Sequence, residues 1–444
     1  MLFFSRKMNL LSILFIVPFQ VAQPADTAKI YEIPAVTVQA PLKHNGVFSE
    51  QPVAVTSLTM ENMESNRIGE SKNLSLTVPN LLFADYGSKM TGSIYIRGIG
   101  ARMDQPAMGL YVDNVPVLNK NNYDFDYFDV RSMDVLRGPQ GTLYGRNTIG
   151  GVIDVHTLSP FDYQGTRFNA EYGNGNTSKV RTSTYHRPTD NFAFSIAFNH
   201  HYSDGFFTNE YDGSPADRIL NESGRLKIQA KLSPQWIMEN VFHANYVKQN
   251  GFAYSLYNKD ADYSINHNDP CSYDRFNLTN GLTFRYKDDK IRFSSTTSFQ
   301  YTDDDMTLDQ DFRLASLFTL RQLQQENAVT QEFVVRPAEG KAWQWISGVF
   351  GFYRNIGLDA PVTFKRDGID ELILANANAG IHTVFPEADL QIREEQFPIE
   401  SHFKLPAFGM SLYHQSDMKA GRWKFVAGIR FDYERTAIRY SNFA

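Results

Sequence analysis

From Arg167 onward, the sequence alternates between apolar and polar residues over segments of about ten residues, the length of a transmembrane strand. The clearest segment places Phe192, Phe194, Ile196 and Phe198 at every second position, with small or polar residues between them. Successive side chains of a strand point to opposite faces, so such a segment has one apolar face and one polar face. This pattern is typical of membrane β-barrels, whose apolar face meets lipid.

Charged residues lie opposite the apolar stripe in other segments. Leu226 and Ile228 alternate with Arg225 and Lys227, and the segment from Trp423 to Glu434 alternates in the same way. The charged face must therefore meet water or a plug inside the barrel. A soluble β-sandwich also alternates, but its strands are typically nearer six residues, so the length favours the membrane.

Composition agrees with a membrane barrel. Aromatic residues make up 14% of the 444 residues, and the mean hydropathy is −0.38. Past the N-terminus the sequence has no apolar run long enough for a membrane helix. The net charge of −6 provides no basic field for nucleic acid. Cys271 is the single cysteine, so no internal disulfide is possible.

The N-terminus has the three parts of a signal peptide. A basic segment, Ser5-Arg6-Lys7, precedes an apolar core from Leu10 to Phe19, which is too short to span a bilayer. Small and polar residues follow, which predicts cleavage near Ala22, with Ala25 as the alternative. The protein is therefore expected to be exported.

A glycine-rich insert lies between two short apolar runs in residues 129–160. It contains Gly138, Gly141, Gly145, Gly150 and Gly151, which indicate tight turns and close packing. No Gly-Lys-Ser/Thr follows and no GxGxxG is present, so a phosphate-binding loop is not indicated. The order LRGPQGTLYGRNTIGGVI closely resembles the plug-domain signature of TonB-dependent outer-membrane receptors.

Two further segments resemble the same plug. Ser93 to Gly100 resembles its IRG strand, and Gly109 to Val117 resembles its YVDGVPV hairpin, with Asp113-Asn114 as the tight turn. Asp134 stands where the family usually has Glu, and Asn80 where it usually has Gly. The plug-motif residues that the resemblance implies are Arg97, Gly98, Asp134, Arg137, Gly138, Pro139, Gly141, Tyr144, Gly145 and Arg146.

The resemblance implies a β-rich fold in which an α/β plug sits inside a transmembrane antiparallel β-barrel. We expect a signal peptide at residues 1–22, a TonB-box segment at 23–44, the plug at 45–160 and a receptor barrel at 161–444. The family's barrel has about 22 strands, whereas about eleven or twelve periodic segments are present. The sequence therefore predicts an incomplete barrel, from a fragment boundary or a frameshift, that does not transport alone.

A β-branched segment near the N-terminus resembles the TonB box. An extended segment can add itself as a strand to a partner sheet through main-chain hydrogen bonds. Pro34 lacks an N–H donor, so pairing is expected from Ala35 onward. The residues expected to bind TonB, the periplasmic energy transducer, are Ile33, Pro34, Ala35, Val36, Thr37 and Val38.

Four plug arginines, Arg97, Arg131, Arg137 and Arg146, are candidates for switchable ion pairs with carboxylates of the barrel wall. Structural ion pairs or solvated side chains are the alternative. An ionic contact suits a plug that must be released under modest force, because a large apolar interface would not let go.

The connections between strands are expected to be of two kinds. Short turns such as residues 173–176 and Asp288-Asp289 would face the periplasm, and long polar segments at 203–223, 249–280, 303–327 and 355–400 would face outward. The acidic run Asp303-Asp304-Asp305 is expected to be a solvated part of an outer loop. Neither that run nor His200-His201 predicts a metal site.

Together these features predict a receptor in the outer membrane that takes up a scarce nutrient, driven through TonB by the proton gradient. A ferric siderophore or other iron complex is the expected ligand, with haem, cobalamin and a glycan as alternatives. Outer-membrane lipid is the expected surroundings, and no nucleic acid, cofactor or catalytic group is expected. The alternatives are a passive or structural barrel, a non-functional truncated receptor, and a secreted all-β enzyme or adhesin.

Overall fold

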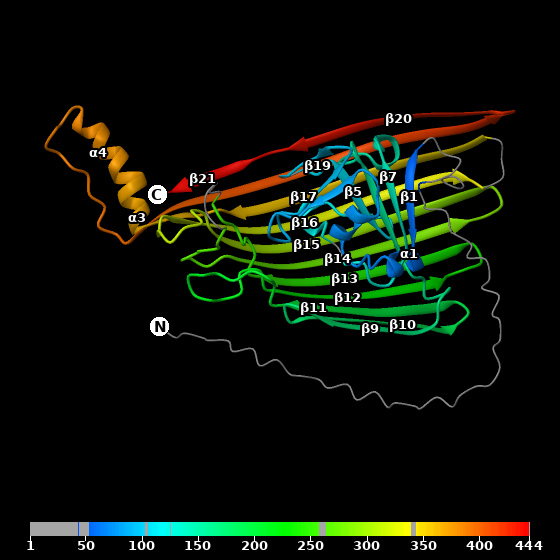
Figure 1. Cartoon of the computed structure of the whole chain (residues 1–444). Coiled ribbons are helices and arrows are strands. Elements are labelled where there is room, and N and C mark those ends of the chain that lie inside the picture. Colours follow the sequence, from blue (N-terminus) through cyan, green and yellow to red (C-terminus); the bar gives the residue numbers. More distant parts are fainter. Residues whose placement is uncertain are drawn as a thin grey trace, which may run out of the picture. The chain divides into compact units, whose positions relative to one another are not determined.

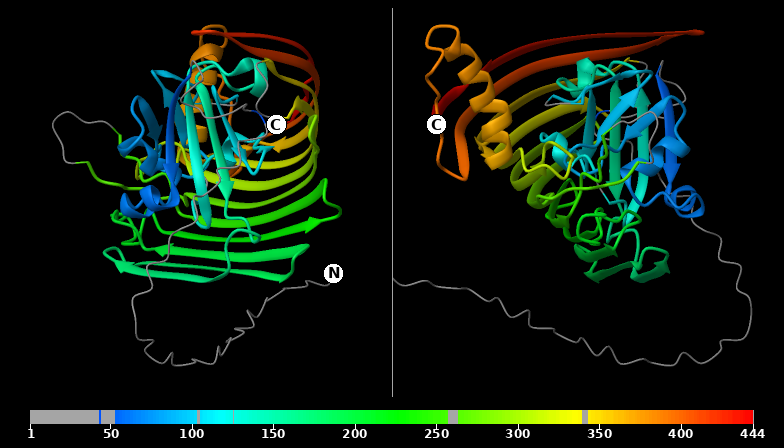
Figure 2. Two further views of the ribbon diagram at one scale, coloured as in Figure 1. Left: turned by 90° about the vertical axis from the view of Figure 1, so that its right-hand side faces the viewer. Right: turned by 60° about the vertical axis from the view of Figure 1, so that its left-hand side comes forward.

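The computed structural model describes residue 43 and residues 53–102, 105–124, 126–256, 263–338 and 343–443. These residues form a small mixed domain, the plug, and a large antiparallel sheet, the wall, which curves around one side of the plug (Figures 1 and 2). This is the predicted combination of a plug and barrel strands.

The plug contains two sheets. The first has five strands in the order β1-β7-β8-β5-β6, with β5 and β8 parallel and the other pairs antiparallel. Short helices connect the strands, and the core between them includes the fully buried Leu74, Ile96, Met133 and Ile153. The strands of the first sheet are β1 (Ala54–Thr59), β5 (Met108–Val112), β6 (Val115–Pro116), β7 (Val130–Arg137) and β8 (Gly151–Thr157).

The second plug sheet has three strands, and Asn80 and Arg97 reverse the chain beside it with positive φ angles of 61° and 52°. The predicted IRG strand is therefore a hairpin, with Arg97 and Gly98 in its turn. Its elements are β2 (Leu81–Ala84), β3 (Ser93–Ile96) and β4 (Ile99–Gly100), and the plug helices are α1 (Met60–Ser65), η2 (Ser71–Leu76), η3 (Lys120–Asn122) and α2 (Gly141–Tyr144).

Thr59 caps helix α1. Its hydroxyl accepts the N–H of Asn62, and the Asn62 side chain accepts the Thr59 N–H, which forms a reciprocal capping box. The helix begins directly after β1, which pairs with β7 along its whole length up to Thr59.

The wall is one antiparallel sheet of thirteen strands among the described residues. Along β11, the exposed Phe192, Ile196 and Phe198 alternate with the buried Ala193 and Ala197, which confirms the predicted lipid-facing stripe. The strands are β9 (Gly165–Gly173), β10 (Thr177–Thr189), β11 (Phe192–Ser203), β12 (Ile219–Lys231), β13 (Trp236–Gln249), β14 (Ser272–Lys287), β15 (Ile291–Asp309), β16 (Phe318–Pro337), β17 (Trp343–Asp359), β18 (Val362–Lys365), β19 (Gln396–Ala420), β20 (Trp423–Thr436) and β21 (Arg439–Phe443).

The two ends of this sheet leave strand edges open. Within the described part of the chain, β9 pairs only with β10, and β20 pairs only with β19. In hydrocarbon each open edge would leave backbone groups without hydrogen-bond partners.

The described helices include none that is long and apolar enough to cross a membrane.

The connections between strands differ at the two ends of the wall. Residues 190–191, 232–235, 288–290 and 421–422 are short turns at one end, whereas 204–218, 250–271 and 310–317 are longer connections at the other. This asymmetry is typical of outer-membrane barrels, with the long connections outside. Between β18 and β19 the outer end carries helices α3 (Arg366–Gly368), η4 (Ile369–Leu374) and α4 (Ala375–His382) (Figure 1).

Several predicted positions are wrong. The predicted outer segments 203–223, 249–280, 303–327 and 355–400 all include strand residues, such as 219–223 of β12 and 272–280 of β14. The turn at residues 173–176 lies at the outer end, because the Gly175 carbonyl accepts the N–H of Asp204 at 2.8 Å, at the start of a long connection. Asp303 to Asp305 belong to β15 and pair with β14 and β16. Asp304 is 1% exposed because its face of the strand meets the plug, so the polar sequence there is wall rather than loop.

The glycine-rich insert closes the hairpin between β7 and β8. The Gly138 N–H donates to the Gly150 carbonyl at 2.8 Å, and Gly151 pairs with Arg137 in the strand register. Gly151 has a φ of 156°, and a Cβ there would lie 2.1 Å from the Leu136 carbonyl oxygen. Gly141 differs, because a Cβ there would have no neighbour within 4 Å.

We predict that Gly151→Ala destabilises the plug by more than about 2 kcal/mol, because the new methyl group would meet backbone atoms that cannot move aside. Gly141→Ala, in helix α2, should be neutral or stabilising by up to about 1 kcal/mol. Limited trypsin digestion of the full chain in detergent measures this through cleavage at the plug arginines. Equal cleavage rates for the two variants would contradict the packing role of Gly151.

Candidate functional site at the plug–wall contact

A tight turn brings the Asp113 carboxylate to the wall. Asp113 and Asn114 have φ angles of 48° and 69°, and Val112 pairs with Val115, so the turn is of type I′. This confirms the predicted two-residue turn. The carboxylate accepts the N–H of Thr157 at 3.0 Å and its hydroxyl at 2.7 Å, and lies 3.2 Å from Lys227 Nζ of β12.

Lys227 connects Asp113 to acidic and basic groups of the wall. Its Nζ lies 3.6 Å from Glu239 of β13, which in turn pairs with Arg285 of β14 at 2.7 Å. Burial opposes the ionised form of Asp113, but Lys227 and the Thr157 hydrogen bonds hold the pKa of Asp113 well below its usual range. The plug carboxylate is therefore charged at neutral pH and held by a wall cation.

A second carboxylate, Asp129, pairs with Arg225 of β12. Both side chains are at most 2% exposed, and the Arg225 guanidinium also lies 4.8 Å from the centre of the Phe128 ring. Burial raises the pKa of Asp129 to about 6, although Arg225 opposes this. The pair thus holds its full charge only above about pH 6.

A third carboxylate, Glu70, lies at the start of η2. Its Oε1 lies 2.7 Å from Lys179 Nζ of β10, and its Oε2 lies 3.2 Å from Lys72 Nζ. Burial raises its pKa, but the cations Lys72, Lys89 and Lys179 together hold the pKa of Glu70 well below its usual range. Lys89 itself pairs with Asp124 at 2.5 Å within the plug.

The charges are reversed on the later wall strands, where the wall supplies acids. Lys43 Nζ lies 2.9 Å from Glu332 of β16, which also accepts the Tyr413 hydroxyl at 2.8 Å. Plug amides make two similar contacts: Asn119 donates to Glu326 of β16 at 2.8 Å, and Asn121 donates to Asp304 at 3.1 Å. The inner face of the wall is therefore basic on β10 and β12 and acidic on β15 and β16.

Among the four predicted arginines, Arg146 has the predicted wall contact. It lies 3.3 Å from Glu434 of β20, and its guanidinium lies 4.6 Å from the centre of the Phe352 ring. Arg137 instead donates to the Pro79 carbonyl of the plug at 3.4 Å. Arg97 is exposed and Arg131 half-buried, and neither pairs with a carboxylate of a described residue.

Asp134, which replaces the family's Glu, makes no ion pair with a described residue. Its Oδ1 accepts the Ser57 hydroxyl at 2.5 Å across the β1–β7 pair. Burial raises the pKa of Asp134, while the Ser57 hydrogen bond lowers it. The shorter stem keeps this carboxylate within the plug sheet.

The remaining motif residues shape the end of the plug that faces β19 and β20. The Tyr144 hydroxyl donates to Asp154 at 3.1 Å, and its ring packs edge-on against Tyr111 at 4.9 Å. Gly145 has a φ of 75°, and a Cβ there would lie 2.3 Å from the Arg430 guanidinium. Pro139 is exposed. The predicted TonB-binding residues 33–38 lie outside the described residues.

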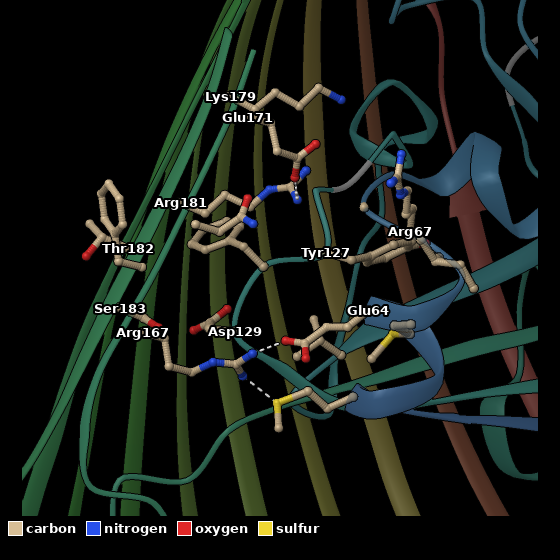
Figure 3. Close-up of a pocket in the computed structure, with 18 of the residues that line it drawn as sticks. Glu64, Arg67, Tyr127, Asp129, Arg167, Glu171, Lys179, Arg181, Thr182 and Ser183 are labelled. Atoms are coloured by element: carbon tan, nitrogen blue, oxygen red, sulfur yellow. Dashed lines mark hydrogen bonds and ion pairs between the residues drawn. The ribbon is translucent and has the colours of Figure 1, made fainter. Parts of the chain in front are cut away.

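A cavity of 910 Å³ lies between the plug and strands β9 and β10 (Figure 3). Arg167, Arg181 and Lys179 project into it from the wall, and Glu64 and Arg67 from the plug. Arg167 pairs with Glu64 of α1. The cavity is thus lined with charges of both signs along the side of the plug.

The outer end of the plug contacts a long connection through aromatic side chains. The Tyr254 hydroxyl donates to the Tyr86 carbonyl, and the hydroxyls of Tyr86 and Tyr95 lie 3.3 Å apart. The Arg102 guanidinium lies 4.8 Å from the centre of the Tyr86 ring. Tyrosine rings and a cation at the outer face can bind an anionic aromatic ligand.

The sequence does not identify the wall cations and the plug carboxylates as partners. Lys227 and Arg225 stand on the charged side of an alternating segment, which predicts a face toward water or plug but names no partner. Asp113 was predicted only as a turn residue. The sequence does contain one indication of this contact, since an acid in a two-residue turn must project from the end of a hairpin.

Among the described residues, no group of three or more His, Cys, Asp or Glu side chains is arranged to hold a metal ion.

The fold is that of an outer-membrane β-barrel wall that holds a plug. Residues 48–152 match the family described as TonB-dependent Receptor Plug Domain, so this part of the chain is a plug domain of that family.

Relatives extend this comparison. The pesticin receptor of Yersinia pestis is 35% identical over 114 residues, which are 25% of this chain and 17% of the receptor. The vitamin B12 transporter BtuB of Vibrio vulnificus is 23% identical over 159 residues, 35% of this chain and 26% of the transporter. The chain therefore matches only a minor part of the length of these relatives.

The solved structure of the ferric yersiniabactin uptake receptor FyuA from Yersinia pestis has the same fold. It superposes with a TM-score of 0.74 at 20% identity, covering 88% of this chain and 58% of that receptor.

We predict that Glu70→Gln destabilises the plug by about 3–5 kcal/mol at pH 7, because Lys179 loses its partner and the buried Lys89 loses a neighbouring negative charge. A carboxyl whose folded pKa is lowered stabilises the fold above its unfolded pKa, near 4.5, and loses that effect as the pH falls further. The difference from wild type should therefore be constant from pH 7 to about 5.5 and shrink below about 4.5. Denaturant unfolding in detergent at several pH values measures it, and a difference that grows on acidification would contradict the assignment.

Proposed function

We propose that the chain acts in TonB-driven uptake of a ferric siderophore or other iron complex across the outer membrane. The observation that carries this proposal is the charge-paired contact between plug and wall, which suits a plug that is seated specifically and released on demand. Likeness to a ferric yersiniabactin receptor supports an iron complex. Likeness to a vitamin B12 transporter keeps cobalamin as the second candidate.

The ligand would be captured at the outer end of the plug. Tyr86, Tyr95 and Arg102 face the connection that carries Tyr254, so plug and wall both contribute to this surface. Many siderophores are anionic and carry aromatic or hydroxamate groups, which suit a cation framed by tyrosines. A ligand that touches both parts can change how the plug sits, and a change in the plug must in turn affect ligand affinity.

Release would begin at Lys43. This lysine is five positions beyond Val38, the last residue of the predicted TonB-binding segment. Its Nζ binds Glu332 at 2.9 Å and the Leu143 carbonyl at 3.3 Å, and lies 4.8 Å and 5.0 Å from the centres of the Tyr111 and Tyr144 rings. Force applied to the segment would reach this contact before the plug sheet.

We predict that Lys43→Met lowers the force of the first rupture when the N-terminus of the reconstituted protein is pulled by an atomic force microscope. The reason is that Glu332 loses a buried partner, a change of about 3–5 kcal/mol. Lys72→Met is the matched control, since its side chain is 50% exposed and its ion pair contributes at most about 1 kcal/mol. An unchanged first rupture in Lys43→Met would remove Lys43 from the release step.

We predict that Val36→Pro abolishes binding of the periplasmic domain of TonB to the purified chain, because proline removes a strand donor in the middle of the segment. Thr27→Pro, outside the predicted TonB-binding residues 33–38, should bind normally. Ferric siderophores, haem and cyanocobalamin are titrated in parallel by fluorescence quenching, and both variants should keep the wild-type ligand affinity. Normal TonB binding by Val36→Pro would refute the box, and failure of every iron complex would refute the ligand class.

A further inference from the structure

The last residue of β15 is a buried aspartate at the outer end of the wall. Asp309 is 0% exposed, pairs in register with Thr319 of β16 and directly precedes the outer connection 310–317. Strand β15 has 19 residues and is about 60 Å long, whereas the hydrocarbon of a bilayer is about 30 Å thick. The Asp309 carboxyl therefore lies outside the membrane-spanning part of the wall, yet the protein shields it from water.

Asp309 holds the end of another outer connection, residues 250–271, against β15. Its Oδ2 accepts the N–H of Asp269 at 3.3 Å, and its own N–H donates to Cys271 Sγ at 3.3 Å. Its Oδ1 has no hydrogen-bond partner among the described residues. A buried carboxylate with an unpaired oxygen is costly, whereas the neutral protonated form costs much less. The contact is therefore most stable when Asp309 carries a proton.

The charges around Asp309 also oppose its ionisation. Burial raises the pKa of Asp309 to about 6, with the negative charge of Asp311 as the next contribution. His267 acts in the opposite direction, and Lys365 is 3.5 Å from Asp269 rather than paired with Asp309. The titratable or charged side chains around this carboxyl, from the two connections, β18 and α3, are His267, Asp269, Cys271, Asp311, Lys365 and Asp367.

The segment held by Asp309 also supports Tyr254, which contacts the plug. His267 donates from Nε2 to the Tyr254 carbonyl at 2.9 Å, and its Nδ1 lies 3.3 Å from Cys271 Sγ. Burial raises the pKa of Cys271 to about 12, so the thiol stays protonated and donates to Nδ1. The rings of Tyr254 and His267 both pack against Phe312, with centres 5.3 Å and 5.8 Å apart. Loosening of this segment would therefore reach the aromatic contact at the outer end of the plug.

We propose that Asp309 and residues 268–271 form an acid-sensitive clasp, which is fastened while the carboxyl is protonated and loosens when the carboxylate ionises. A carboxyl whose pKa is raised in the fold stabilises that fold below its ordinary pKa, near 3.8, and loses this effect as the pH rises through about 6. The clasp is thus tighter in mildly acidic surroundings than at neutral pH. It acts on the outer connections and not on the charge pairs between plug and wall.

The test is hydrogen exchange of the Asp269 and Asp309 amides in the full chain in neutral detergent, measured by mass spectrometry and divided by the intrinsic rate at each pH. Wild-type protection should fall about tenfold from pH 5 to pH 7.5, as a pKa near 6 in the clasp and 3.8 outside it requires. Asp309→Asn, which cannot ionise, should be equally protected at both pH values and at least about tenfold better protected than wild type at pH 7.5. Asp303→Asn, which removes an exposed carboxylate from the same strand, is the matched control and should keep the wild-type pH dependence.

Cys271 provides a second measurement, because it is the single cysteine of the sequence. Its labelling by a thiol reagent at pH 7.5, relative to the same chain unfolded in urea, should be at least about tenfold slower in Asp309→Asn than in wild type.

The proposal is overturned if wild-type protection is equal at the two pH values. Higher protection at pH 7.5 would also overturn it, since that direction is expected for protonation of His267 in acid. Low protection of Asp309→Asn at both pH values would overturn it as well, because a neutral side chain would then not fasten the clasp. Neither a nutrient nor TonB takes part, so the result is independent of the proposed function.

Discussion

The seating of the plug depends on charges that are paired out of water. Lys227 and Asp113 are each 4% exposed at the side chain, and moving either one alone into such a place would cost several kcal/mol. Each charge offsets the cost of burying the other, although Lys227 also has Glu239 of the wall as a partner, so the pair favours one relative position of the wall strand and the plug turn. The same holds for Arg225 with Asp129 and for Lys43 with Glu332. Apolar side chains also meet across the contact, for example Tyr144 of the plug with Val334 and Tyr413 of the wall, and the charge pairs specify the position in which they meet.

The turns of the plug backbone place these charged side chains against the wall. Asp113 reaches the wall because a type I′ turn ends the β5–β6 hairpin, and Arg146 reaches it because the insert after β7 folds back through Gly138 and Gly145. The inner face of the wall carries complementary groups: it is basic on β10 and β12 and acidic on β15 and β16. A plug rotated within the wall would set like charges against each other, so the charge pattern also excludes wrong orientations.

Much of the fold could be predicted because its signals are local. The alternation at Phe192–Phe198 shows which face meets lipid, and the order of residues 136–153 identifies the plug. The partners could not be predicted, because they join positions far apart in the chain. Lys227 and Asp113 are 114 residues apart, and nothing in either neighbourhood names the other. Asp303 to Asp305 were placed in a loop because acidic runs are usually solvated, but here one strand face meets a polar plug. The prediction for Arg137 was also wrong. This motif arginine was expected to contact the wall, but it contacts Pro79 within the plug.

The claim that paired charges seat the plug is tested most directly by a double-mutant cycle on Asp113 and Lys227. The free energy of unfolding of the plug is measured for wild type, Asp113→Asn, Lys227→Gln and the double variant in the full chain. We expect a coupling free energy of about 1.5–3 kcal/mol, with the double variant more stable than the sum of the single changes implies. A coupling free energy within about 0.3 kcal/mol of zero would contradict it, because the two charges would then contribute to the seating independently.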